Sequence, residues 1–476
     1  MKHRLKLFFL FLFLLPLTAL WGEFYFQGSD HQLEVIRVKG KKPGLTVLIF
    51  GGIHGDEPGG YFSSEILSKI KLHKGNLIIV PRVNFPSIML NRREVNGDMN
   101  RKFVHEELPN DPDAEVVKLL KNLMKEADIF INQHDAYGFH RETQISGLYN
   151  PSCYGQSLII DTANFYSEKL KKNINLSEIG QNILKRVNRR IKNEAHYFGF
   201  WDHNSVDRNT RFQEMRRSAT YFALTTYSIP AFGLETSKDL PTLFHKVKYQ
   251  LLVIEEILRE FGLEAVFPSP RVIPPVLYWV EFLRNGKEVI RVNGNTNLRL
   301  DPRDKIVVKK ISANYPTGLS ANILNWGKIN DVDNEYVFSN NITTILVKKN
   351  HMTIGKIYLK KFAPNSIREI TVDVNGTLTK IPNWGLIRLK PREYFEIKDT
   401  RPHFPAARFD VRGFSLVSGR RDDSHVKIYA ENLLKEYSSR KEGEIYFVKI
   451  YNGQGFAGGF QVEILTAQKK GSTHPN

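Results

Sequence analysis

Two histidines and one glutamate have the residue types and spacing of a catalytic metal site. His54 and Glu57 lie three residues apart in the segment Gly51–Glu57, and His134 follows much later in the chain. One turn of helix or a tight loop directs two side chains with this spacing at one point, and the glycines of the segment permit the turn. Two imidazoles, one carboxylate and an open fourth position describe a catalytic zinc site. The alternative is a solvated histidine and glutamate in a glycine-rich loop, because a His-x-x-Glu pair alone is a weak signal.

Glu235 is the candidate general base of this site. It lies in the segment Gly233–Thr236, directly after an apolar run. A carboxylate beside a metal takes the proton of the attacking water and passes it to the leaving amine. The alternative roles are helix capping and a salt bridge, and the predicted position at a strand end counts against both.

A polar segment, Asn91–Phe103, holds three candidate substrate-binding residues. The planar guanidinium of Arg101 and the amide of Asn100 are suited to clamp a carboxylate. Arg93 is suited to polarise a carbonyl group and to stabilise the oxyanion that forms from it. The alternative is an ordinary surface loop, which is the usual meaning of such a polar segment.

Short apolar strands that alternate with helices must position these residues. Buried strands are predicted over Thr46–Phe50, Asn76–Val80, Asp128–Asn132 and Ile229–Leu234. Helices are predicted from Pro58 to Lys71 and over Val116–Ala127, Leu176–Asn193 and Leu243–Glu260. This alternation predicts an α/β domain with a mixed, largely parallel sheet and helices on both faces. His54, His134 and Glu235 follow predicted strands, so we expect them at the carboxyl edge of the sheet, where ligands bind.

The second half of the chain changes character near Glu264. Four prolines between Val266 and Pro275 predict a stiff linker. Beyond it, strands of about 5–8 residues between polar turns predict two all-β modules, each a sandwich or barrel of about 100 residues. One helix, near Asp423–Ser438, is predicted inside the second module. The predicted division is a signal peptide over residues 1–22, a catalytic domain over 23–265, a β domain over 266–362 and an immunoglobulin-like β domain over 363–476.

The amino terminus predicts export. Lys2, Arg4 and Lys6 precede the largely apolar run Leu7–Leu20, which is a basic region followed by a short apolar core. The run is shorter than the ~20 residues that a helix needs to span a bilayer, and the alternative to a cleaved signal peptide is an uncleaved membrane anchor through residues 7–20. The single cysteine, Cys153, excludes an internal disulfide. Export without disulfides favours a bacterial periplasm.

The charge of the chain limits its partners. Among 476 residues, 68 Lys and Arg against 50 Asp and Glu give a formal net charge of +18. Such a surface suits an anionic partner, such as nucleic acid, acidic lipid or an acidic cell-wall polymer. The basic residues are spread along the chain and the chain is predicted to be exported, so we expect no nucleic-acid partner.

The ordered set His54-Gly55-Asp56-Glu57, Asn100-Arg101, His134 and Glu235 resembles the zinc carboxypeptidases of the carboxypeptidase A superfamily. The resemblance covers about residues 33–262. It implies an eight-stranded mixed sheet, one Zn²⁺ per chain and removal of one residue from a free carboxyl end. It makes His54, Glu57 and His134 the zinc ligands, Glu235 the base, Asn100 and Arg101 the binders of the terminal carboxylate, and Arg93 the oxyanion stabiliser.

The whole layout is similar to one subgroup of this family, the D,L-carboxypeptidases that trim peptidoglycan tripeptides to dipeptides and set helical cell shape in curved bacteria. The shared features are export, a basic chain, two β modules after the catalytic domain and the short spacing between Arg93 and Arg101. The resemblance implies that the substrates are muropeptide stems ending in meso-diaminopimelate. The β modules are expected to dock the glycan or a protein partner, or only to brace the catalytic domain. Asp135 stands where Ser is common in the family, and three candidates exist for the substrate-capping tyrosine, namely Tyr197, Tyr221 and Tyr227.

Two other functions fit parts of the pattern. The first is a zinc-dependent deacylase of the aspartoacylase or succinylglutamate desuccinylase type, which shares the ligand motif and an Asn-Arg pair. Export and the appended β modules count against it, because those deacylases act on cytosolic metabolites. The second is a non-catalytic cell-wall-binding protein. The presence of all three ligands and of Glu235 argues against a decayed site.

Overall fold

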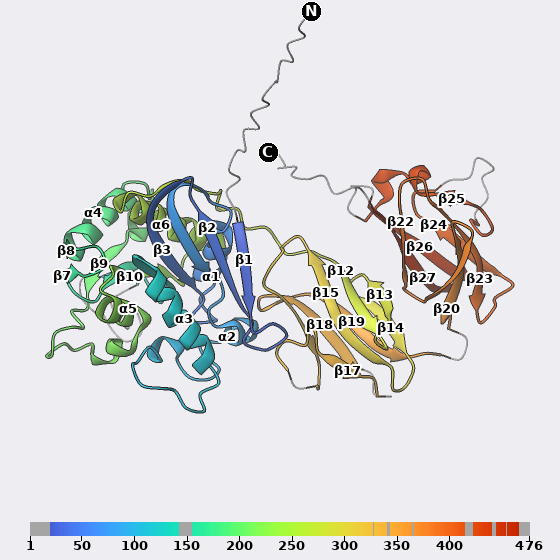
Figure 1. The fold of residues 1–476 in the computed structure, drawn as a ribbon, viewed down its shortest axis with the longest axis horizontal. Helices are drawn as coiled ribbons and strands as arrows, with labels where there is room; N and C mark the ends of the chain where they lie inside the picture. The colour runs from blue at the N-terminus through green and yellow to red at the C-terminus, as the bar shows by residue number, and fades with distance from the viewer. Residues whose placement is uncertain are drawn as a thin grey trace, which may run out of the picture. The chain divides into compact units, whose positions relative to one another are not determined.

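The computed structural model describes residues 20–141, 155–326, 328–339, 343–363, 366–414, 422–439, 444–453 and 455–465. Two compact units divide the chain, Met1–Ile273 and Pro274–Asn476 (Figure 1). Most of the predicted export segment, at residues 1–19, and Cys153 lie outside the described residues. In the part of the chain that is described, no helix is long and apolar enough to cross a membrane.

A nine-stranded mixed sheet forms the centre of the first unit. Its path runs β1-β2-β4-β3-β5-β10-β6-β9, and β11 pairs with the first residues of β4. The strands are β1 (Leu20–Tyr25), β2 (Leu33–Lys39), β3 (Lys42–Gly51), β4 (Lys71–Val80), β5 (Ile129–Ala136), β6 (Ser157–Ile160), β9 (Gly199–Asp202), β10 (Ala231–Ser237) and β11 (Glu264–Val266). The prediction of a mixed sheet is confirmed, with one strand more than the eight that the resemblance implies.

Most of the parallel pairings lie in the middle of the sheet. β4, β3, β5 and β10 are consecutive parallel neighbours, and β6 and β9 form a further parallel pair. The remaining pairings, which include β1 with β2 and β10 with β6, are antiparallel. β5 is therefore flanked by parallel strands on both sides, and its residues are almost entirely buried.

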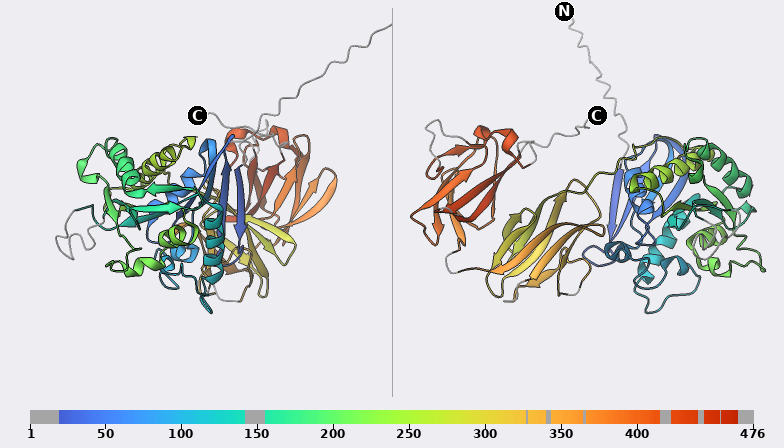
Figure 2. Two further views of the ribbon diagram at one scale, coloured as in Figure 1. Left: turned by 60° about the vertical axis from the view of Figure 1, so that its left-hand side comes forward. Right: turned by 180° about the vertical axis from the view of Figure 1, so that it is seen from behind.

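Helices cover both faces of this sheet (Figure 1, Figure 2). They are α1 (Pro58–Leu67), α2 (Phe85–Leu90), α3 (Ala114–Glu126), α4 (Leu176–Asn188), α5 (Ala219–Tyr227) and α6 (Leu243–Glu260). α1 and α4 pack on α6, whereas α3 packs on α5. The predictions for α3 and α6 are confirmed, whereas α4 begins at Leu176 as predicted but ends at Asn188 and not at Asn193. α1 begins at Pro58 as predicted but ends at Leu67, because β4 already begins at Lys71.

α3 shows why these segments are helical. Its buried residues recur at the spacing of one helix face, and they are Val116, Val117, Leu120, Leu123 and Met124. The opposite face carries charged side chains. The spacing of apolar residues does not predict α2 or α5, because both helices are short and most of their residues are apolar or small.

The second unit is built from strands, as predicted for this part of the chain. Residues 277–361 form one pair of four-stranded sheets, and residues 369–464 form another. The first pair contains β12 (Leu277–Arg284), β13 (Glu288–Val292), β15 (Lys305–Ala313) and β17 (Glu335–Val337), facing β14 (Thr296–Leu300), β16 (Leu319–Ile323), β18 (Thr343–Lys349) and β19 (Met352–Lys361). The second contains β20 (Glu369–Val374), β21 (Thr377–Pro382), β23 (Tyr394–Arg401) and β25 (Ile428–Tyr429), facing β22 (Leu386–Leu389), β24 (Ala407–Val411), β26 (Ile445–Asn452) and β27 (Gly455–Ile464).

The predicted helix at Asp423–Ser438 is wrong. Its described residues form β25 and two three-residue 3-10 segments, Ala430–Asn432 and Lys435–Tyr437. Ile428 and Ala430 are both buried in the core between the sheets. A spacing of two residues between buried positions belongs to extended chain, and packing against the two sheets decides the conformation here.

A buried ion-pair network joins β2, the end of β4 and α1. Arg82 lies directly after β4 with its side chain only 3% exposed. Its guanidinium donates to the Glu34 carboxylate at 3.1 Å and also bonds the Glu65 carboxylate. Both carboxylates are buried, so the Arg82 cation compensates negative charge that water does not reach.

We predict that Arg82→Met destabilises the first unit by about 3–5 kcal/mol, the usual cost of removing one partner from a buried ion pair. Arg37→Met is the matched control, because Arg37 pairs with Glu23 and Glu126 at the surface and should cost only about 0–1 kcal/mol. Urea unfolding followed by fluorescence measures both changes. Equal, small effects of the two substitutions would contradict the role of Arg82.

Candidate metal centre

Three parallel strands bring the candidate residues together. The turn after β3 carries His54 and Glu57, His134 lies in β5, and Glu235 lies in β10. The register pairs Glu235 with His134 as direct neighbours in β10 and β5. Paired residues of neighbouring strands project from the same face of a sheet, so both side chains lie on the pocket side.

Glycine allows the turn that carries the first two residues. Gly52 has φ +70, and a Cβ added to Gly55 would lie only 2.0 Å from the carbonyl carbon of Ser87. The Gly55 N–H also donates to the Arg93 carbonyl oxygen at 3.3 Å. The turn is therefore packed against α2 and against the segment that follows it, and only glycine fits there.

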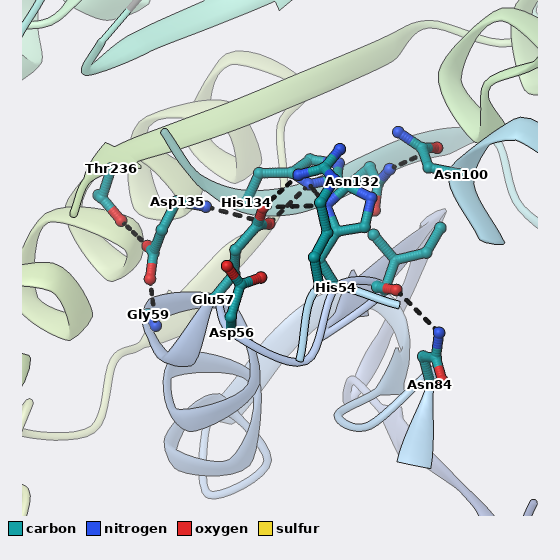
Figure 3. A network of polar contacts seen from close by, with 12 residues as sticks. His54, Asp56, Glu57, Gly59, Asn84, Asn100, Asn132, His134, Asp135 and Thr236 are labelled. Carbon is teal, nitrogen blue, oxygen red and sulfur yellow. Dashed lines mark hydrogen bonds and ion pairs between the residues drawn. The ribbon is translucent and has the colours of Figure 1, made fainter. Parts of the chain in front are cut away.

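His54, Glu57 and His134 converge on one point (Figure 3). Glu57 Oε1 lies 2.9 Å from His54 Nδ1, and Glu57 Oε2 lies 2.9 Å from His134 Nδ1. The two Nδ1 atoms are 3.2 Å apart, and the three ligand atoms lie within 4.8 Å of one another. All three residues are buried. Two imidazole nitrogens and a carboxylate that converge in this way fit a metal ion, because they are donors of the kind that zinc takes.

Asp98 supports this cluster from outside. His54 Nε2 lies 3.0 Å from Asp98 Oδ1, and Arg93 contacts both Glu57 Oε1 at 3.1 Å and Asp98 Oδ2 at 3.2 Å. A metal-binding histidine usually gives its other ring nitrogen to a carboxylate, which fixes the tautomer and the ring orientation. The contact with Asp98 is therefore a second feature that fits a metal site, and it leaves Nδ1 of His54 as the ligand atom.

The buried charges shift the pKa values of the three residues. Burial would lower the pKa of His54, but the Glu57 charge and the hydrogen bonds to Asp98 and Glu57 raise it to about 9. Burial opposes ionisation of Glu57, yet the charges of His54 and His134 hold its pKa well below the usual range. Burial lowers the pKa of His134 against the opposing charge of Glu57. The metal-free cluster thus holds an ionised carboxylate, a protonated His54 and a neutral His134 at pH 7.

Asp135 lies on the opposite face of β5. Its carboxylate accepts a hydrogen bond from the Gly59 N–H at 2.8 Å and another from the Thr236 hydroxyl (Figure 3). Burial raises the pKa of Asp135 to about 6. Asp135 therefore ties the first turn of α1, which directly follows Glu57, to β5 and β10.

The pocket beside the cluster has a volume of about 350 Å³. It is lined by every residue of the predicted site, together with residues from β5, β6, β10 and the start of α5 and with His203, which follows β9. The lining includes His54, Glu57, Arg93, Asn100, Arg101, Asn132, His134, Ile159, His203, Ser218, Thr220 and Glu235. The assignment of individual roles to these residues stays a prediction.

Asn100 and Arg101 form part of the short 3-10 segment Met99–Arg101. Asp98 caps this segment by accepting the Asn100 N–H at 2.9 Å. The Asn100 side-chain oxygen accepts from Ala219 N at 3.0 Å and from Asn132 Nδ2 at 3.4 Å. Because these donors hold the Asn100 side-chain oxygen, the NH₂ group of the amide is not used by them. Arg101 lines the pocket next to Asn100.

Glu235 has the electrostatic properties of a base. Burial raises its pKa well above the usual value, and the charges of Glu57 and Asp135 add to this, while His54 and Arg93 act in the opposite direction. Among the described residues, its carboxylate has no side-chain hydrogen bond. A carboxylate with a raised pKa accepts and returns protons near neutral pH, which suits general base catalysis.

Sequence reasoning missed a residue that supports the cluster and several residues that line the pocket. Asp98 lies in the predicted polar loop, where no neighbouring residue marks it as different from an ordinary solvated aspartate. His203 lies in a part of the chain without a recognised motif. Tyr137 and Lys238 line the pocket just after β5 and β10, and the strand order that brings these two strand ends together is not evident from the sequence. Tyr197, Tyr221 and Tyr227 do not line it, whereas Tyr137 does.

Comparison with known proteins identifies relatives of two segments. Residues 21–267 match a family described as carboxypeptidase controlling helical cell shape, catalytic, and residues 363–465 match the C-terminal domain of metallo-carboxypeptidase. A search of curated proteins found no match.

Solved structures of the cell shape determinant protein Csd4 from Helicobacter pylori share the fold. The product-bound and tripeptide-bound forms are 21% identical, with a TM-score of 0.55 over 91% of this chain and 100% of that chain. The form bound to mDAP, described as a D,L-carboxypeptidase, is 21% identical with a TM-score of 0.53 over 89% of this chain and 97% of that chain.

Removing a residue that only hydrogen-bonds a metal ligand costs roughly 10- to 100-fold in metal affinity. We predict a larger loss of metal affinity for His134→Ala, because this substitution removes one of the two imidazole donors. Metal content after dialysis, measured by mass spectrometry, checks this. His203→Ala is the control, because His203 lines the same pocket outside the cluster and should keep the metal. Full metal content in His134→Ala would refute the role of His134.

A second prediction concerns the proton that His54 releases when a metal ion binds. Since the pKa of His54 is about 9 in the metal-free protein, metal binding at pH 7 must displace about one proton from its imidazole. The apparent affinity for Zn²⁺ should therefore rise about tenfold per pH unit between pH 6.5 and 8. Calorimetric titration in buffers of different ionisation enthalpy measures the proton release. A pH-independent affinity over this interval would show that His54 is already neutral.

Proposed function

Because the chain belongs to the family of carboxypeptidases controlling helical cell shape, we propose that it is a zinc D,L-carboxypeptidase of peptidoglycan. It removes terminal meso-diaminopimelate from tripeptide stems and leaves dipeptides. The observation that carries this proposal is the convergence of His54, Glu57 and His134 in one pocket with Glu235 and Arg101. The tripeptide and mDAP bound to Csd4, a protein of the same fold, support the choice of substrate.

His54, Glu57 and His134 would hold one Zn²⁺ per chain. Zinc fits better than a hard cation such as Mg²⁺, because two of the three donors are imidazole nitrogens. When bound, the ion polarises the scissile carbonyl and makes water acidic enough to lose a proton at neutral pH. Asp98 orients His54 for this role.

Arg101 and Asn100 bind the terminal carboxylate of the stem. The guanidinium offers two parallel N–H donors, and the Asn100 NH₂ group offers a further donor beside it. Arg93 donates to the oxygen of the scissile carbonyl as that oxygen gains charge. Its side chain is 47% exposed, so the guanidinium has room to turn from Glu57 towards a substrate.

Glu235 moves the protons of the reaction. Its carboxylate takes one proton from the attacking water and returns it to the amine of the departing diaminopimelate. Its neighbour in the sheet is His134, so the base lies directly beside the cluster. The raised pKa of Glu235 favours uptake of the proton in the first step and allows its return in the second.

The periplasm is the proposed location, since the amino-terminal sequence has the pattern of an export signal. An uncleaved anchor through residues 7–20 would hold the enzyme at the membrane facing the same compartment. The net charge of +18 favours a position near an anionic wall. The β modules are proposed to contact the glycan or a wall-associated protein.

A muropeptide digest tests the function. Purified protein is incubated with tri-, tetra- and pentapeptide muropeptides, with and without a chelator, and mass spectrometry follows the products. We predict conversion of tripeptide to dipeptide that the chelator abolishes and added Zn²⁺ restores. Loss of D-Ala from the longer stems alone would change the specificity. No change in any muropeptide, from protein shown to hold zinc, would favour an N-acyl amino acid deacylase instead.

Glu235→Gln should keep the metal but lose at least roughly 100-fold in kcat, the scale expected for a general base. The substitution preserves the size of the side chain and removes its ability to take a proton. Metal content measured on the same sample controls for loss of the site. Near-wild-type turnover in this variant would remove Glu235 from the mechanism.

A further inference from the structure

The pocket has a buried end and an open end. At the buried end, His203 is 5% exposed and Ser218 is 2% exposed, and the Arg101 charge acts on His203. At the open end, Tyr137 is 61% exposed and lies beside Lys238. A carboxypeptidase encloses one terminal residue, and everything on the amino side of the scissile bond must leave towards solvent. The open end therefore receives the residue that precedes the scissile bond.

Lys238 is fixed at this open end. It follows β10 directly, and its backbone N–H donates to the Ala136 carbonyl oxygen at 2.7 Å. Its ammonium donates to Asp56 Oδ2 and lies 4.5 Å from the centre of the Tyr137 ring. Only 13% of the side chain is exposed. The side chain is thus held in place before any substrate arrives, which reduces the entropy lost on binding.

The ammonium keeps its charge and a free donor. Burial lowers the pKa of Lys238, but the hydrogen bond to Asp56 and the charge of Glu57 raise it above the ordinary value. An ammonium group has three N–H donors, and Asp56 takes one of them. Since Lys238 lines the pocket, a substrate anion there can accept another.

The proposed substrate has an anion at the corresponding place. In the stem tripeptide, the scissile amide joins the side-chain γ-carboxyl of D-glutamate to an amine of diaminopimelate. The α-carboxylate of that D-glutamate is consequently free, and it lies on the amino side of the scissile bond. An ordinary α-linked peptide has no carboxylate at this position.

We propose that Lys238 binds the free α-carboxylate of the γ-linked D-glutamate and makes the enzyme select stems in which this group is not amidated. This inference rests on the proposed function, because it requires a stem tripeptide in the pocket. Lys238 is then a specificity-determining residue at the open end, and Arg101 binds the other carboxylate beyond the scissile bond. Asp56 and Tyr137 act as positioning residues for the ammonium.

The test compares two substrates that differ in one group. They are the tripeptide L-Ala-γ-D-Glu-meso-diaminopimelate and the same tripeptide with the D-glutamate α-carboxylate converted to its amide. The zinc-loaded protein should show a kcat/KM at least about tenfold higher for the free acid, the scale of one charge-assisted hydrogen bond. Lys238→Met should lose at least about tenfold on the free acid and change by less than about threefold on the amide.

Two further variants distinguish the effect of losing the Lys238 charge from an effect on the fold. Lys238→Arg keeps the positive charge and should keep the preference for the free acid. Lys118→Met removes an exposed lysine elsewhere on the same unit and should change neither rate. Equal losses on both substrates in Lys238→Met would overturn the inference, because they would reveal a structural effect.

The rates of the wild-type protein on the two substrates also test the inference without any variant. Equal kcat/KM values on the two substrates would overturn the role of Lys238 and leave the proposed function intact. Failure to cleave either substrate, in protein shown to hold zinc, would overturn both. A preference for the free acid that disappears only in Lys238→Met is the supporting result.

Discussion

The parallel register between β5 and β10 is the constraint on which the rest of the structure depends. It sets Glu235 beside His134 and turns both towards the pocket. A slip of one residue would move either side chain to the opposite face, where Asp135 and Thr236 lie. Those two residues bond to each other, and Asp135 also accepts a hydrogen bond from the Gly59 N–H at the start of α1. The register is therefore held by polar contacts on one face of the sheet and used for chemistry on the other.

Hydrogen bonds and ion pairs connect the candidate metal cluster to the segment that carries Asn100 and Arg101. Glu57 contacts both histidines and Arg93, and Asp98 contacts His54 and Arg93 while it caps the segment that carries Asn100. The Asp98 carboxylate thus orients a proposed metal ligand and a proposed substrate-binding residue together. His54, Glu57 and His134 are buried, so the contacts among these three residues are stronger than the same contacts in water, and removal of one partner leaves the others uncompensated.

The sequence allowed the central strands and the main ligands to be predicted, because His54, His134 and Glu235 follow apolar runs that only a buried sheet explains. Asp98 could not be found in this way, since nothing in its polar segment separates a supporting carboxylate from a solvated one. The predicted helix at Asp423–Ser438 failed because packing between two sheets outweighed local helical spacing. Tyr137 and Lys238 depend on which strand ends lie together, and that follows from strand order, which the sequence did not define.

We predict that one metal ion lies among two Nδ1 atoms and one carboxylate, at the side of the pocket that holds Glu235. The most direct test is a crystal structure of zinc-loaded protein with data collected on both sides of the zinc absorption edge. The predicted result is a single anomalous peak within bonding distance of His54 Nδ1, His134 Nδ1 and the Glu57 carboxylate. A peak elsewhere in the chain, or zinc held through other residues, would contradict the assignment of this pocket as the metal centre.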